Sequence, residues 1–237
     1  SCEEDNDYQI ITGIELNGAN ESDQHATVAM VQQLSDSGLK PEELLADTNY
    51  GSGQNIIECA EMGVDLQAPV QDPDATVTPD PWEKPVEATR GADLGEPSSL
   101  LPQPEPRAEA FGLEAFKFTD TFDEVIECPG GHSPLEQHLD SARRMIFATF
   151  SAAACDDCPL GQLCITRSNR GGERTLRNGR ATAATAHRQA LQETSEFKDG
   201  YKKRSGVEST NAELKGRHGA RNLRVRGRKR NGIRLVN

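Results

Sequence analysis

Residues 41–70 read PEELLADTNYGSGQNIIECAEMGVDLQAPV, and their pattern decides the fold. The short apolar run at 44–46 predicts a strand that ends at Asp47. Residues 53–63 predict a helix closed by a glycine, and residues 64–70 predict a second strand. A strand, a helix and a strand in this order indicate two parallel strands in an α/β domain.

The same pattern extends toward the N-terminus. Residues 7–18, DYQIITGIELNG, alternate and are rich in isoleucine, which predicts a further strand. Residues 21–38, ESDQHATVAMVQQLSDSG, predict a helix that Ser22 or Asp23 caps and Gly38 ends. Both elements fit the same α/β unit.

The composition divides the chain into five segments. Eight of the thirteen prolines and nine acidic residues lie between positions 71 and 110, which is typical of a loop or a disordered insert. The predicted segments are an α/β core at 1–70, a Pro-rich acidic insert at 71–112, a Cys-rich β insert at 113–180, a helical region at 181–217 and a basic segment at 218–237. We expect the helical region to break at Gly200.

The overall composition is that of a folded but polar protein. Hydrophobic residues make up 35% and charged residues 27% of the 237 residues. No apolar stretch approaches the roughly 18 residues of a membrane helix, and the acidic start SCEEDNDYQII lacks the pattern of a signal peptide. The sequence therefore predicts a cytoplasmic protein without a membrane segment.

The charge is unevenly distributed. The net charge is −12, yet residues 201–237 hold twelve Lys and Arg against two acidic residues, a local charge of +10. The rest of the chain therefore carries −22. Such a division is typical of a basic element that meets phosphate, and a solvated basic tail is the alternative.

Four of the six cysteines form a cluster. They are Cys128, Cys155, Cys158 and Cys164. The first opens the sequence CPGGH and the other three lie in CDDCPLGQLC. A C-x2-C pair brings two thiolates to one side of an ion, and two more cysteines complete a tetrahedral, structural zinc site. His132 or His138 can replace one ligand, and four reduced thiols without a metal are the alternative.

Asp47 has two interpretations. Ligands of α/β sheets bind beyond the carboxyl ends of the strands, where this residue is expected. Its carboxylate could hold Mg²⁺, which takes one or two carboxylates together with phosphate oxygens and water. The alternative is that Asp47 caps the turn that follows.

Five polar side chains fall in step along the predicted helical region. They are Tyr201, Arg204, Glu208, Asn211 and Lys215. Steps of 3, 4, 3 and 4 residues place them in one stripe of a helix. One carboxylate between two cations and a phenol suits a metal ion and the phosphates around it. A solvated face with an ordinary Arg204–Glu208 pair is the alternative.

The spacing Tyr-x2-Arg-x3-Glu-x6-Lys resembles the signature around the catalytic glutamate of bacterial insertion-sequence transposases with a DDE (Asp-Asp-Glu) site. The segment LLADTNYGS around Asp47 resembles the part of that family that carries its second aspartate. The stretches ESDQHATVAMVQQL and RHGARNLRVRG are also similar to the family. The cysteine cluster resembles an insert that some members carry between the second aspartate and the glutamate.

The resemblance implies a partial RNase H-like core with a Pro-rich and Cys-rich, zinc-ribbon-like insertion. Asp47 and Glu208 would hold Mg²⁺ (or Mn²⁺) for metal-dependent strand cleavage and transfer at the ends of an insertion sequence. The implied partners are insertion-sequence ends and target DNA, engaged by a homodimer. The expected DNA-binding residues are Tyr201, Arg204, Lys215, Arg221, Arg224 and Arg226.

One departure from the family concerns its first catalytic aspartate, which stands on a strand before those predicted here. Asp5, Asp7 and Asp23 do not have that position. We therefore expect an N-terminally truncated copy with a weakened metal site. A non-catalytic zinc-ribbon DNA-binding protein that uses residues 217–234 is the alternative function, and an inactive remnant is the third.

Overall fold

The computed structural model describes residue 12 and residues 25–71 and 111–217, apart from the side chains of Glu208 and Ser209. Several predictions lie outside the described residues: most of the strand at 7–18, nearly all of the Pro-rich insert, and the basic segment with Arg221, Arg224 and Arg226. No helix in the described ranges is long and apolar enough to cross a membrane.

The first part of the chain forms the predicted α/β unit. Its elements are α1 (Ala26–Asp36), β1 (Glu43–Leu45), the short 3₁₀ turn η2 (Thr48–Tyr50), α2 (Gly53–Glu61) and β2 (Asp65–Gln67). β1 and β2 pair in parallel, with Leu44 opposite Leu66, which confirms the predicted parallel strands.

Both helices of this unit end in the same way. Gly38 and Gly63 adopt left-handed φ values of 72° and 70°. After α1 the amides of Gly38 and Leu39 donate to carbonyls of the last helical turn, and Gly63 and Val64 do the same after α2. The predicted glycine ends are confirmed. The start of α1 is a correction, because the helix begins after His25 and not at Ser22 or Asp23.

The second part of the chain is a β structure. β3 (Lys117–Phe118) and β4 (Val125–Glu127) pair antiparallel. β5 (Glu136–Asp140), β6 (Met145–Phe150), β7 (Arg167–Ser168) and β8 (Arg174–Gly179) form an antiparallel sheet in the order β5-β6-β8-β7. The short elements η3 (Leu113–Ala115), α3 (Ala152–Asp156) and η4 (Gly161–Leu163) complete it.

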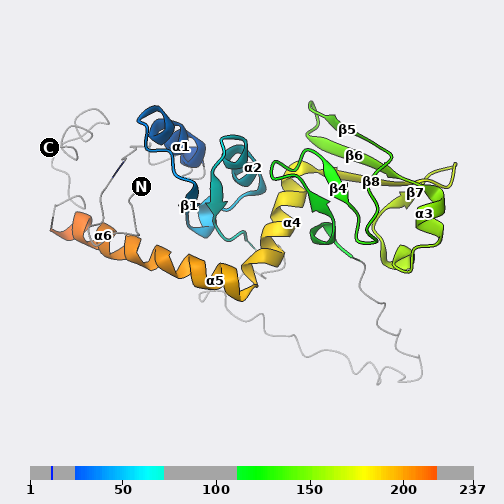
Figure 1. The fold of residues 1–237 in the computed structure, drawn as a ribbon. Coiled ribbons are helices and arrows are strands. Elements are labelled where there is room, and N and C mark those ends of the chain that lie inside the picture. Colours follow the sequence, from blue (N-terminus) through cyan, green and yellow to red (C-terminus); the bar gives the residue numbers. More distant parts are fainter. Residues whose placement is uncertain (1–11, 13–24, 72–110, 218–237) are drawn as a thin grey trace, which may run out of the picture.

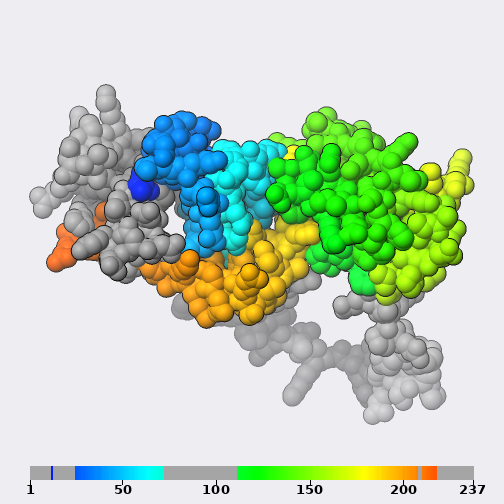
Figure 2. Space-filling view, in the orientation of Figure 1, coloured from blue at the N-terminus to red at the C-terminus, as the bar shows by residue number. Residues whose placement is uncertain are grey.

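A series of helices follows directly on β8. Its members are α4 (Arg180–Gln192), α5 (Ser195–Tyr201), the 3₁₀ turn η5 (Lys202–Arg204) and α6 (Ser205–Gly216). α4 lies between the α/β unit and the sheet, and α5 and α6 run along the α/β unit (Figures 1 and 2). The break falls at 193–194, where Thr194 Oγ1 accepts from Phe197 N at 3.2 Å. The predicted break at Gly200 is wrong, since α5 runs through that residue.

The α/β unit and the β structure each have a hydrophobic core of their own. The first joins α1, α2, β2 and α4 through nine buried side chains: Val31, Ile56, Ile57, Cys59, Val64, Leu66, Ala68, Val70 and Ala184. The second lies under the four-stranded sheet and consists of Phe116, Val125, Ile146, Ala148, Phe150 and Leu176. Ala184 on α4 is one of the buried members of the first core, and Ala181 of the same helix packs against that core, so the α/β unit is complete only when α4 packs on it.

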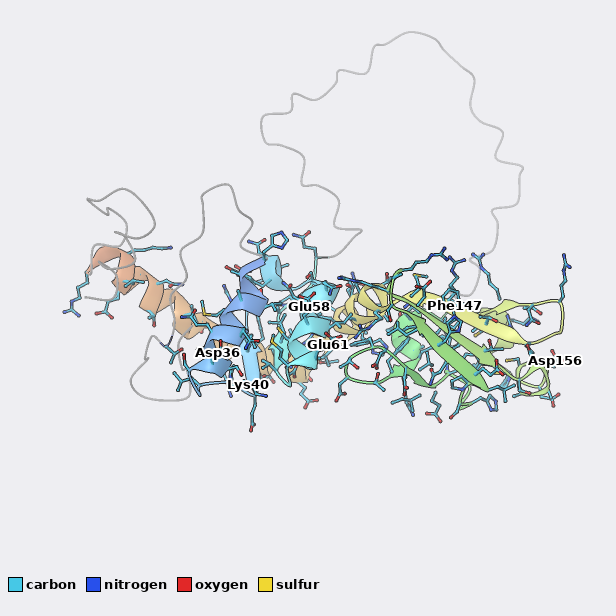
Figure 3. The ribbon with its side chains drawn as sticks, turned by 90° about the horizontal axis from the view of Figure 1, so that it is seen from above. Asp36, Lys40, Glu58, Glu61, Phe147 and Asp156 are labelled. Carbon is cyan, nitrogen blue, oxygen red and sulfur yellow. The ribbon has the colours of Figure 1, made fainter. Side chains whose placement is uncertain are left out.

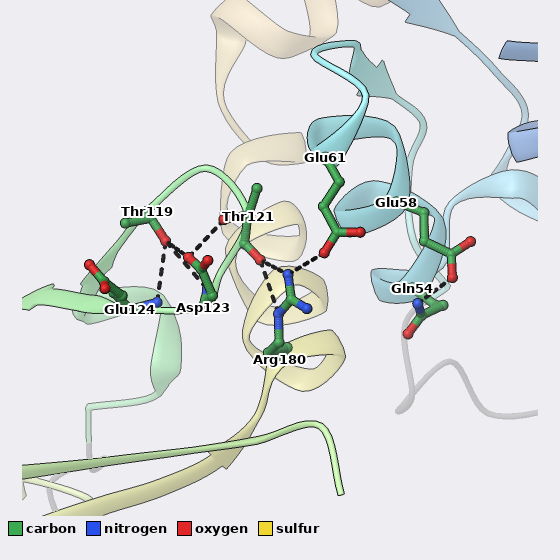
Figure 4. Close-up of polar contacts among 8 residues, drawn as sticks. All are labelled: Gln54, Glu58, Glu61, Thr119, Thr121, Asp123, Glu124 and Arg180. Atoms are coloured by element: carbon green, nitrogen blue, oxygen red, sulfur yellow. Dashed lines mark hydrogen bonds and ion pairs between the residues drawn. The ribbon is translucent and has the colours of Figure 1, made fainter. Parts of the chain in front are cut away.

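Arg180, the first residue of α4, ties the two parts together (Figure 4). Its Nη2 donates to Glu61 Oε1 of α2 at 2.7 Å and to the Thr121 carbonyl of the β3–β4 loop at 2.6 Å. Thr119 and Thr121 donate to Asp123 in that loop, and these hydrogen bonds lower the pKa of Asp123. One guanidinium thus fixes the β structure against the α/β unit.

His187 on α4 makes a second contact between α4 and the β structure. Its ring lies edge-on to Phe118 and Phe122, with centroids 5.4 and 5.3 Å apart. Nε2 lies 3.1 Å from the Leu113 carbonyl, which can only accept, so Nε2 carries the proton. Burial lowers the pKa of His187, while backbone interactions with Leu113 and Phe116 and the charge of Glu114 oppose the shift.

This contact predicts a pH-dependent stability. Because the folded pKa of His187 lies below 6.5, the unfolded state binds more protons once the pH falls below that value. The contribution of His187 is therefore present above about pH 6.5 and is lost as the pH falls through the folded pKa. We expect the free energy of unfolding, measured in urea, to fall between about pH 7.5 and pH 5.5, and less so in His187→Gln. An equal fall in both proteins would contradict this role.

Candidate active site

Asp47 stands just beyond the end of β1, as predicted. Its backbone is extended, and its Oδ1 accepts from Thr48 N at 2.6 Å to start η2. The capping interpretation of Asp47 is therefore realised in the structure. It uses one carboxylate oxygen and leaves the other for a second interaction.

The series of helices brings two residues of the predicted stripe to this point. Arg204 Nη2 donates to Asp47 Oδ2 at 3.2 Å, and the two residues are 157 positions apart in sequence. Tyr201 Oη donates to the Ala46 carbonyl at 2.9 Å. The Asp47 side chain remains 48% exposed and that of Arg204 24%. The carboxylate is thus held at a surface that solvent and a ligand can reach.

The environment of Tyr201 keeps its hydroxyl protonated, so that it acts as a hydrogen-bond donor. Its ring stacks on Phe197, with centroids 5.7 Å apart. Burial raises the pKa of Tyr201, the charge of Asp47 raises it further, and Arg204 opposes both. The hydroxyl therefore keeps its proton at neutral pH and anchors α5 to the end of β1.

The remaining stripe residues lie further along α6. Position 208 comes one helical turn after Arg204. The side chain of Glu208 lies outside the described residues. Lys215 is exposed in the last turn of α6. The structure thus brings together Asp47, Tyr201 and Arg204, while the roles of Glu208 and Lys215 stay predictions.

The chemistry at this point fits a hard cation in part. Asp47 offers carboxylate oxygens, which magnesium prefers, and Arg204 now supplies the positive charge beside them. Within the described ranges no three His, Cys, Asp or Glu side chains are arranged as a metal site. The residues therefore fit a magnesium site that needs a second carboxylate, water and phosphate oxygens to be complete.

The four clustered cysteines line one small cavity of about 20 Å³ under the four-stranded sheet. Cys128 opens a tight turn in which Gly131 N donates back to its carbonyl. A Cβ at Gly130 would lie 2.9 Å from Cys158 Sγ and 3.7 Å from Cys128 Sγ, so this glycine lets both sulfurs approach. Cys164 Sγ lies 3.1 Å from Thr166 Oγ1. The predicted gathering of the cysteines is observed, although the thiols are not in a metal-binding arrangement.

The predicted substitute ligands have different positions. His132 lines the cavity. His138 instead stacks on Phe147 at 4.8 Å, and Phe147 belongs to the other face of the sheet, so His138 is no candidate ligand.

Sequence reasoning missed Arg174. This residue lines the same cavity, and its guanidinium donates to the Gly161 and Thr166 carbonyls at 2.8 and 3.2 Å. Its Nε is buried without a hydrogen-bond partner. Burial raises the pKa of Cys155, and the charge of Arg174 opposes this. The only signal in the sequence is the alternation of β8, which places position 174 on the buried face with Leu176 and Asn178.

Residues 127–236 match the family model of the transposase DDE domain. The match includes all four clustered cysteines and Glu208, and it begins after Asp47. The predicted resemblance to DDE transposases is confirmed for this part of the chain, and such a domain has DNA as its general partner. The same comparisons found no match among curated proteins and none among solved structures.

Proposed function

We propose that this chain, which carries the match to the transposase DDE domain, contributes to metal-dependent DNA cleavage and strand transfer at the ends of an insertion sequence. The observation that supports this most is the Arg204–Asp47 contact. It joins the end of β1, outside the matched segment, to the signature helix inside it. Asp47 and Glu208 are the proposed ligands of Mg²⁺ or Mn²⁺, and a homodimer on paired DNA ends is the proposed assembly.

Each side chain then has a defined task. Bound divalent ions supply an activated water or 3′-hydroxyl and neutralise charge at the leaving oxygen. Asp47 would hold the metal through its carboxylate, and Arg204 would contact a DNA phosphate beside it. Tyr201 keeps the helix in register with β1 through Ala46. The remaining phosphate contacts are assigned to Lys215, Arg221, Arg224 and Arg226.

Iron-mediated backbone cleavage tests the metal site without requiring DNA cleavage. Fe²⁺ takes the place of Mg²⁺ and, with peroxide and ascorbate, cuts the chain near its ligands. We expect cuts near positions 47 and 208 that excess Mg²⁺ suppresses. Asp47→Asn and Glu208→Gln should each remove both cuts, because the site would have one carboxylate left. The matched control is Asp36→Asn, an exposed acid at the end of α1. Cuts that persist in both variants would overturn the proposed site.

A structural zinc ion in the cysteine cavity is the second part of the proposal. The four thiols share one cavity and would have to draw closer around an ion; Gly130 gives two sulfurs room to approach, and the buried Arg174 Nε lacks a hydrogen-bond partner beside them. A zinc ion with four thiolates carries a net negative charge, which a neighbouring guanidinium stabilises by hydrogen bonding to sulfur. The site would have no open position, so its role is to stabilise the β structure.

The zinc proposal predicts about one zinc per chain in the purified protein, measured by elemental analysis. Cys158→Ser should lose the metal and lower the melting temperature, and a zinc chelator should lower it in the unmodified protein. Cys59→Ala is the control, because that thiol is buried in the first core, where burial raises its pKa to about 11. Zinc content that stays unchanged in Cys158→Ser, or an absence of zinc in the unmodified protein, would contradict the site.

A further inference from the structure

The four-stranded sheet has one buried and one open face. Along β6 the residues alternate, with Ile146, Ala148 and Phe150 fully buried and Met145, Phe147 and Thr149 partly exposed. The buried set belongs to the second core. Figure 3 labels Phe147 on this sheet, in the part of the molecule that lies across α4 from β1. The site at Asp47 does not use this face.

Three planar side chains form a row across the open face. The strand register places His138 of β5 opposite Phe147 of β6, and Phe147 opposite Arg177 of β8. The His138 and Phe147 rings are parallel within 2°, with centroids 4.8 Å apart. The Arg177 guanidinium carbon lies 5.5 Å from the Phe147 centroid. Because β6 lies between β5 and β8, the phenyl ring is enclosed between the imidazole and the guanidinium.

The row is open at its outer end. β5 is the edge strand of the sheet, so no strand lies beyond His138, and both His138 and Arg177 are exposed. A flat group placed on the outer face of the imidazole would continue the stack at the same spacing. Nucleic-acid bases are such groups, and they stack on aromatic side chains and guanidinium planes when they are unpaired.

The charges around the row favour a phosphate chain as its occupant. Arg177 and Arg167 lie on the open face, and Arg143 and Arg144 form the tip of the β5–β6 hairpin. Arg143 pairs with Asp140, whose carboxylate also accepts from the Ala142 and Arg143 amides at 3.1 Å. The other three arginines then stand against Glu136. The excess of arginine complements the phosphates that would flank a stacked base.

We infer that the open face of the β5-β6-β8-β7 sheet binds unpaired DNA, with a base stacked on the His138–Phe147–Arg177 row and its phosphates on the arginines. The inference rests on the proposed function for the choice of DNA as the partner, and it requires neither Asp47 nor Glu208. A strand-transfer enzyme handles unpaired nucleotides next to its cleaved ends, and this face would hold them apart from the metal site.

Fluorescence anisotropy with a labelled oligothymidine and with a duplex of the same length tests the inference, using the whole chain and no divalent metal. Phe147→Leu should weaken single-strand binding about ten-fold, as expected for the loss of one stacked base. Arg177→Gln should weaken it similarly and reduce the slope of affinity against salt by about 0.7, the value for one phosphate contact to a single strand. Duplex affinity should change by less than about two-fold in both, because paired bases cannot join the stack.

Two controls distinguish the possible failures. Thr149→Val changes the same face outside the row and should bind as the unmodified protein does. Asp47→Asn and Glu208→Gln should also retain single-strand binding, so loss of the metal site and loss of this face give different results. Arg177 is exposed, so its variant reports on binding even if Phe147→Leu fails to fold.

Several results would overturn the inference. They are unchanged single-strand binding in Arg177→Gln, an equal loss of duplex and single-strand binding, or stronger binding of an RNA strand than of DNA. Photo-crosslinking of an iodouracil oligonucleotide should map to residues 136–149 or 174–179. Crosslinks found only elsewhere in the chain would also exclude this face.

Discussion

Gly53→Ala is expected to lower the free energy of unfolding by about 3 kcal/mol, which is the upper range for overpacking a close contact. A Cβ at this position would lie 2.0 Å from the Ala181 carbonyl oxygen and 2.6 Å from Thr185 Oγ1. Both neighbours belong to α4, and the oxygen is backbone, so α2 and α4 would have to move apart. The first core spans that contact, and Ala184 would lose its packing.

The measurement is thermal and urea unfolding, and the melting temperature should fall by roughly 10 °C. Gly200→Ala is the matched control, because it makes the same chemical change in α5 and its Cβ meets nothing within 4 Å. That variant should be more stable by about 0.5–1 kcal/mol, since alanine favours a helix over glycine. Equal effects at the two positions would show that α2 and α4 do not pack as described.

Arg188→Ala is expected to lower the free energy of unfolding by about 3–4 kcal/mol. Its guanidinium is 6% exposed and donates to Gln67 Oε1 at 2.9 Å and to the Leu66 carbonyl at 2.8 Å. It also lies over the Phe197 ring at 5.4 Å. Alanine would leave a cavity between α4 and β2 and remove the donors from the buried Leu66 carbonyl and the half-buried Gln67 Oε1.

Arg217→Ala is the control for this change, because that arginine is exposed and, among the described residues, its side chain pairs with Glu213 one turn earlier. Its loss should cost less than about 0.5 kcal/mol. Arg188→Lys should give an intermediate value, since one ammonium cannot reach the acceptors that the planar guanidinium bridges. Urea unfolding of the three variants in parallel gives the ranking, and an Arg188→Ala value equal to that of Arg217→Ala would refute the role.

The features that could be predicted from the sequence depend on interactions between residues close together in the chain. Gly38 and Gly63 end their helices because the left-handed conformation is open to glycine, and both appear as predicted. Asp47 lies beyond a strand because the apolar run before it is short and ends there. The break in the helical region has a local signal as well, Thr194 as N-cap with Glu196 in the first turn. This signal outweighs the glycine at position 200, where the break is predicted.

The features that could not be predicted depend on contacts between distant segments. Nothing near Arg204 in the sequence shows that it pairs with Asp47, since that contact requires α4 and α5 to pack on the first core. The row of His138, Phe147 and Arg177 exists only in one strand register, which a change of one residue would destroy. The spacing of the cysteines predicted their proximity, while the place of Arg174 beside them depends on the pairing of β8 with β6.

The position of α4 has a consequence for synthesis of the protein on the ribosome. The first core contains residues of α1, α2 and β2, and Ala184 of α4 packs into it. Arg188 of the same helix donates to the Leu66 carbonyl of β2. Leu66 and Arg188 are separated by 122 residues, which take ~6–24 s to translate at the usual rates. During that interval the apolar face that α4 will cover stays open to solvent and to chaperones. The α/β unit therefore completes its core only after α4 has been synthesised.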